Sequence, residues 1–112
     1  MFSIESIPTL ISIKMERGIA YMYHYKVIAT IIEIRGTGVC SYGHKVGDQF
    51  EFTEKTPPGL CQFAYDSIRS AVAALLYGGQ FPWAPNRDVT TWACPDPDVP
   101  VIFELKRIPL EP

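Results

Sequence analysis

One segment of this chain repeats apolar residues at helical spacing, whereas the segments on both sides of it alternate. The repeating apolar positions are Leu60, Ala64, Ile68, Val72, Leu75 and Leu76. Prolines 57 and 58 precede this segment and Gly78-Gly79 follows it, and such residues are typical of a helix start and a helix end. We therefore predict one principal helix over Leu60–Tyr77.

The other regular segments have the pattern of strands. Gln49–Thr53, Val89–Ala93 and Val101–Leu105 are short and extended, and Val27–Ile34 is apolar on both faces, which predicts a central strand. Val27–Ile34 belongs to a long extended stretch, residues 19–35, in which we expect a bend or bulge near residues 24–26. Strands on both sides of a single helix favour an α+β fold. We predict a mainly antiparallel sheet of four to six strands with the helix packed on one face.

The length of 112 residues fits one small domain, 1–112. Within it, residues 1–25 have the pattern of an N-terminal extension that forms a hairpin or an edge strand, with a strand at Thr9–Met15 and a turn at Glu16-Arg17-Gly18. Unpaired strand edges invite association. We therefore expect that these N-terminal strands could hold a homo-oligomer together.

Charge and hydropathy exclude several classes of protein. The formal net charge is −2 and the ten Lys and Arg residues are scattered, which argues against nucleic-acid binding. No apolar run approaches a membrane span, and the first ten residues lack the basic start of a signal peptide. We therefore expect a cytoplasmic protein that does not enter a membrane and whose thiols stay reduced.

The chemistry-bearing residues are the three cysteines and one of the two histidines: Cys40, His44, Cys61 and Cys94. Cys40 and His44 share a glycine-rich loop, so both could face one point at little cost in loop closure. Zinc accepts a tetrahedral set of three cysteines and one histidine, and thiolates also suit iron. The first hypothesis is a metal-binding protein with these four residues as ligands. If one ligand stays free, an open position would allow catalysis.

Two alternatives use the same cysteines differently. Cys61 follows a proline-glycine segment at the predicted helix start, where the helix dipole would stabilise a thiolate. A cysteine-dependent enzyme or redox protein would then have Cys61 as its reactive thiol and His44 as its base. In the other alternative the cysteines pack at the core edge as small apolar residues, and His44 is an exposed turn residue.

A further alternative is a noncatalytic binding module. The loop after the predicted helix carries Phe81 and Trp83, and Trp92 lies in the following strand. These rings could line a pocket for a flat apolar ligand. Whether the protein is an enzyme stays open at this point.

Four motifs together resemble a family of small uncharacterised prokaryotic proteins. The motifs are C-S-Y-G-H-K-V-G-D-Q-F at residues 40–50, L-C at 60–61, G-G-Q-F-P-W at 78–83 and C-P-D-P-D at 94–98, which leads into the last strand. The family pattern is similar to a Cys-x3-His-Lys-x-Gly-Asp turn, a Gly-Gly-x-x-Pro-Trp loop and a Cys-Pro-Asp-Pro segment. The resemblance covers Lys26 to Ile108. It implies no activity, and residues 65–67 depart from the family's histidine-containing helix.

Overall fold

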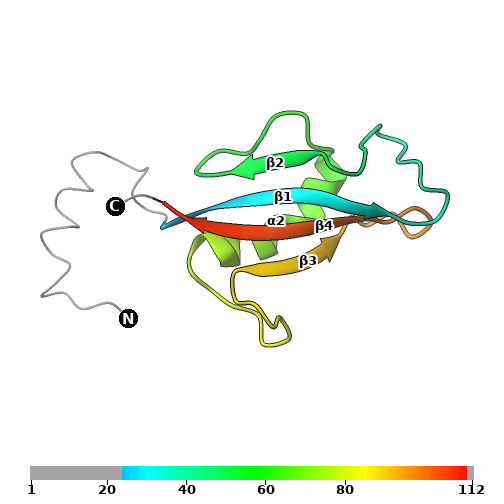
Figure 1. Ribbon diagram of the computed structural model, residues 1–112. Coiled ribbons are helices and arrows are strands. Elements are labelled where there is room, and N and C mark those ends of the chain that lie inside the picture. Colours follow the sequence, from blue (N-terminus) through cyan, green and yellow to red (C-terminus); the bar gives the residue numbers. More distant parts are fainter. Residues whose placement is uncertain (1–23, 111–112) are drawn as a thin grey trace, which may run out of the picture.

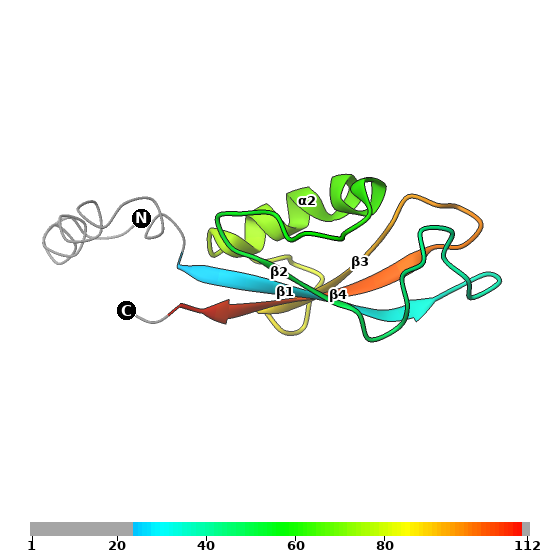
Figure 2. The same cartoon turned by 90° about the horizontal axis from the view of Figure 1, so that it is seen from above.

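The computed structural model describes residues 24–110. The elements in this part of the chain are β1 (Tyr25–Ile34), β2 (Gln49–Phe52), α2 (Gln62–Leu76), β3 (Val89–Ala93) and β4 (Val101–Pro109). The strands form one sheet in the order β2-β1-β4-β3, and every neighbouring pair is antiparallel (Figure 1). Figure 2 shows α2 lying across one face of this sheet. The predicted α+β fold, with one helix on an antiparallel sheet, is confirmed.

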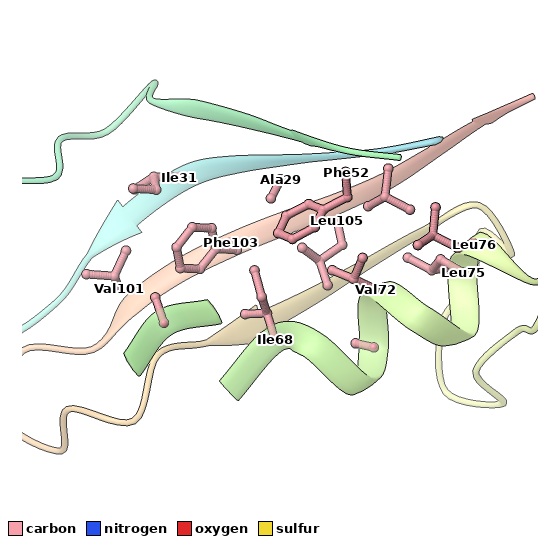
Figure 3. Close-up of a cluster of buried hydrophobic side chains, with 13 residues drawn as sticks. Ala29, Ile31, Phe52, Ile68, Val72, Leu75, Leu76, Val101, Phe103 and Leu105 are labelled. Atoms are coloured by element: carbon pink, nitrogen blue, oxygen red, sulfur yellow. The ribbon is translucent and has the colours of Figure 1, made fainter. Parts of the chain in front are cut away.

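The core fills the space between the sheet and α2. Alternate residues of β1 and β4 point toward the helix, and the apolar stripe of α2 covers them (Figure 3). The fully buried members are Val27, Ala29, Ile31, Ile68, Ala71, Leu75, Phe103 and Leu105. The apolar periodicity that predicted the helix is therefore the periodicity of its buried face.

The strands differ from the prediction in two places. A bend lies at His24, directly before β1, within the range 24–26 where a bend or bulge was expected, and the register of β1 against β4 shifts between Ile31 and Glu33, which was not expected. β4 also continues to Pro109 because it pairs along the whole of β1. The predicted strand Thr9–Met15, its turn and residues 19–23 of the long extended stretch lie outside the described residues.

Arg107 occupies an inner position of β4, where the alternation of the strand directs it toward the helix. Its side chain is fully buried. The guanidinium group donates hydrogen bonds to the backbone oxygens of Leu75, Gly79 and Arg87 and to the Asp88 carboxylate. Arg107 therefore ties the C-terminal end of α2 and the following loop to the sheet.

Candidate functional site

A cavity of about 210 Å³ lies at the N-terminal end of α2. Three segments meet at this end of the sheet: the loop after β1, the start of α2 and the turn between β3 and β4 (Figures 1 and 2). All four residues of the metal hypothesis line this cavity: Cys40, His44, Cys61 and Cys94. The strand pairing therefore brings together residues that are far apart in the sequence.

Each cysteine is a free, half-buried thiol at the edge of the core. Cys61 is the residue that precedes the first turn of α2, and no acidic residue occupies that turn. The unpaired amides and the positive dipole end of the helix favour negative charge there. The Cys94 Sγ accepts a hydrogen bond from the Val101 N–H at 3.3 Å, which joins the two ends of the β3–β4 turn.

His44 is buried, so the interpretation of it as an exposed turn residue is wrong. Its ring packs against Tyr42 and Phe50, with centroid separations of 4.6 and 5.2 Å. The Cys61 N–H donates a hydrogen bond to Nε2 at 3.1 Å, and Nδ1 lies 3.8 Å from the Asp48 carboxylate. The lone pair on Nε2 is thus engaged by the start of the helix, so His44 holds the loop against α2.

Burial sets the charge of this histidine. Removal from water lowers the pKa of His44 below its ordinary value, and the nearby Asp48 carboxylate acts in the opposite direction with a smaller effect. A neutral imidazole with Nε2 as acceptor carries its proton on Nδ1, the atom that faces Asp48. The neutral form is therefore the one that fits the contacts of the ring.

The loop that carries Cys40 is fixed at its base and at its start. The Gly47 N–H donates to the Ile31 oxygen at 2.8 Å, and the Ile31 N–H donates to the Asp48 oxygen at 2.9 Å. At the start of the loop, Gly36 has a φ of +67° and packs so closely on the Asp98 carbonyl oxygen that a side-chain carbon would overlap it. Gly36 therefore allows the loop and the β3–β4 turn to meet beside the cavity.

The cysteines share a cavity without forming a coordination sphere. Among the described residues, no group of three or more His, Cys, Asp or Glu side chains is arranged to hold a metal ion. Metal binding would require the sulfurs to converge by side-chain rotation.

Two aromatic residues at the mouth of the cavity complete the site. Tyr42 and Phe63 line it, although 55% and 65% of their surface is exposed to solvent. The role of Phe63 was missed in the sequence. Its position two residues after Cys61, off the apolar stripe of the helix, is the signal that could have revealed an aromatic side chain at the mouth.

The aromatic residues of the binding-module hypothesis form a separate cluster. The ring centroid of Phe81 lies 5.0 Å from the ring centroid of Trp83 and 5.6 Å from that of Trp92. Trp83 is 63% exposed, whereas the other two are half-buried against the core. This cluster includes a residue of β3 and does not contribute to the lining of the cysteine cavity.

Comparison with protein-family models, curated proteins and solved structures gives no match to this chain. The resemblance to the uncharacterised prokaryotic family therefore stays a prediction. Within residues 24–110, no helix is long and apolar enough to cross a membrane.

Proposed function

We propose that the protein binds one transition-metal ion, zinc or iron, through the thiolates of Cys40, Cys61 and Cys94. The observation that carries this proposal is that three free thiols from three separate segments line one cavity. Thiolates are soft ligands that select zinc and iron over magnesium and calcium. Three thiols around one cavity are a stronger indication of metal binding than a single cysteine is.

Two of the three cysteines lie beside electropositive groups of the backbone. The positive end of α2 lies at Cys61, and the Val101 N–H donates to the sulfur of Cys94. Both groups would stabilise a negatively charged metal–thiolate centre electrostatically.

In this proposal His44 positions the loop and is not counted as a ligand. Its Nε2 accepts the Cys61 N–H, so ligation through that atom would break the contact between the loop and α2. The four-ligand set predicted from the sequence thus becomes three thiolates, with His44 as a positioning residue.

Elemental analysis of protein purified without chelator tests the proposal. We expect about one zinc or iron per chain, and Co²⁺-loaded protein should show sulfur-to-cobalt charge-transfer absorption. Cys40→Ser should lose most of the metal and melt at a lower temperature, because metal binding is coupled to folding. Ser41→Ala is the matched control, since Ser41 lines the same cavity without a thiol. The proposal would be contradicted if the purified protein contains no metal and its melting temperature does not change when chelator is added.

The second candidate is a cysteine-dependent enzyme or redox protein, which the position of Cys61 at the start of α2 favours. It requires Cys61 to react with iodoacetamide much faster than Cys40 and Cys94 at mildly acidic pH. Equal and slow reactions of the three thiols would exclude it. A binding module built on Trp83 is the third candidate, and loss of partner binding in Trp83→Ala would support it.

The proposal also concerns the cellular location and the partners of the protein. Thiolate ligands must stay reduced, so we place the protein in the cytoplasm. A homo-oligomer through the N-terminal strands stays a prediction, because those strands lie outside the described residues; light scattering tests it. The absence of nucleic-acid binding, inferred from a net charge of −2, is tested by a DNA and RNA binding assay at low salt.

A further inference from the structure

We propose that the apolar surface around the mouth of the cavity is a docking site for another protein, one that presents aromatic or aliphatic side chains beside lysine or arginine. Four residues form this surface, which we call the apolar rim: Val39, Tyr42 and Val46 in the loop after β1, and Phe63 at the start of α2. Docking here is separate from the proposed metal binding and needs no ion in the cavity.

The exposed apolar side chains of the described residues gather at this end of the sheet. Seven large hydrophobic residues are exposed between positions 24 and 110, and the four of the apolar rim are each more than half exposed. Val39 directly precedes Cys40 and Val46 lies two residues after His44, and both of these neighbours line the cavity. Single exposed hydrophobic residues are normal, but several in one place mark an interaction surface.

Two members of the apolar rim occupy positions where polar residues are usual. Backbone hydrogen bonds close two turns in the loop, over residues 40–43 and 45–48, each with an N···O distance of 3.0 Å. Tyr42 lies inside the first turn and Val46 inside the second. Surface turns favour Gly, Asn, Asp and Ser. Folding does not bury the two apolar side chains at these tips, so a partner is what would cover them.

The apolar rim is held in place from beneath. The ring of Tyr42 packs on the buried ring of His44 at 4.6 Å, and His44 accepts the Cys61 N–H at 3.1 Å. This contact joins the loop to the helix start that carries Phe63. Side chains that are already positioned lose less conformational entropy when they bind. The apolar rim is therefore suited to recognition of a partner without rearrangement of the loop.

The charges beside the apolar rim define the chemistry of the partner. Arg35 is already paired with Glu33 at 3.2 Å. The remaining charged side chains of the loop and of the β3–β4 turn are one cation and three carboxylates: Lys45, Asp48, Asp96 and Asp98. An acidic surrounding attracts lysine and arginine and repels the phosphates of an anionic membrane. The surface therefore fits a basic and apolar protein segment better than a lipid surface.

The test is a selection of random short peptides, displayed on phage, against the immobilised full-length protein purified without chelator. We expect the selected peptides to combine Trp, Phe or Leu with Lys or Arg. Fluorescence polarisation of the best labelled peptide then gives its affinity, which should fall as salt is added because the charges lie at the surface. Bound peptide should also slow the alkylation of the cavity thiols by iodoacetamide, since it covers the mouth.

Variants of the apolar rim locate the binding. Phe63→Ser and Val46→Ser should each weaken peptide binding roughly tenfold. Val46 does not line the cavity, so its effect distinguishes the exposed surface from the cavity itself. Tyr77→Ala is the matched control, because Tyr77 is an exposed aromatic residue at the other end of α2. It should leave the affinity as it is.

Several results would overturn the docking site. They are a selection that enriches no peptide, enriched peptides that are acidic, and binding that neither Phe63→Ser nor Val46→Ser weakens. Sedimentation of the protein with phosphatidylglycerol vesicles, lost in Phe63→Ser, would assign the apolar rim to a membrane surface instead. A dimer in light scattering that Phe63→Ser dissociates would assign it to a second copy of this chain. None of these results bears on the metal content, so the two proposals can fail separately.

Discussion

Replacement of Arg107 by methionine should destabilise the fold strongly, although methionine is nearly as long and more apolar. The Arg107 side chain is 0% exposed and donates to the oxygens of Leu75 at 3.2 Å, Gly79 at 2.7 Å and Arg87 at 2.7 Å. Its Nε also donates to the Asp88 carboxylate at 3.0 Å. Methionine fills the space of the methylene groups but donates none of these hydrogen bonds.

The magnitude follows from the groups that would lose their donor. A buried polar group left without a partner costs about 1–3 kcal/mol, and Arg107 serves three backbone oxygens. Those of Gly79 and Arg87 lie in the loop after α2, where water can partly replace the guanidinium group. We therefore expect Arg107→Met to lower the free energy of unfolding by about 3–5 kcal/mol, the range for removing one partner of a buried charged network.

Asp88→Asn is the matched control. The Asp88 side chain is 50% exposed, and the amide oxygen of asparagine can still accept from Arg107. The loss should therefore be smaller than for Arg107→Met, because the guanidinium group keeps its three backbone acceptors and half of the Asp88 side chain is in water.

Urea unfolding followed by tryptophan fluorescence measures both variants. The slope with denaturant should match the parent if the folded state is retained. If Arg107→Met is unfolded, Arg107→Lys, which keeps the charge and fewer donors, should show an intermediate loss. A loss below 1 kcal/mol for Arg107→Met, or an equal loss for Asp88→Asn, would refute the assignment of stability to the three backbone contacts.

Two further predictions concern the loop that carries Cys40. Burial lowers the pKa of His44 in the folded protein, so the unfolded chain, with a histidine pKa of about 6.5, binds more protons and the metal-free protein should lose stability as pH falls below about 6.5. His44→Gln, whose amide oxygen can still accept the Cys61 N–H, should lack this pH dependence, and parallel pH profiles of the two proteins would contradict the assignment. Gly36→Ala should cost about 2–4 kcal/mol because a positive φ and an overlap with the Asp98 oxygen act together. Gly43→Ala, where φ is also positive but no atom lies within 4 Å, should cost less, and equal melting temperatures would refute the packing argument.

The elements that the sequence predicted well are those set by local pattern. The helix expected over Leu60–Tyr77 spans Gln62–Leu76, and β3 has the predicted bounds Val89–Ala93. Prolines, glycines and the spacing of the apolar residues mark the ends of these two elements to within a few residues. The end of β4 is different, because its pairing with β1 carries it past Leu105 into a stretch containing Lys106 and Arg107. Pairing partners far away in sequence leave no local signal.

In the candidate site, too, local sequence features were predictable and contacts between distant segments were not. Residue type alone selected Cys40, His44, Cys61 and Cys94, and all four line one cavity. The hydrogen bond from the Cys61 N–H to His44 was beyond sequence reasoning, since it joins a loop to the start of a helix. The exposed aromatic side chain of Phe63 at the mouth depends likewise on how α2 is turned on the sheet.

The order of the strands has a consequence for the synthesis of the protein. β1 begins the described part of the chain, and β4, its partner at the centre of the sheet, ends it. A chain emerging from the ribosome can pair β1 with β2 early, but β1 must wait for β4 until β2, α2 and β3 have all been made. Cys94 lines the cavity from the start of the β3–β4 turn. Before this turn forms, the three thiols of the nascent chain do not share a cavity and are exposed to solvent. We therefore expect the cavity to form only after the β3–β4 turn has folded, and the three thiols to be most sensitive to oxidation before that point.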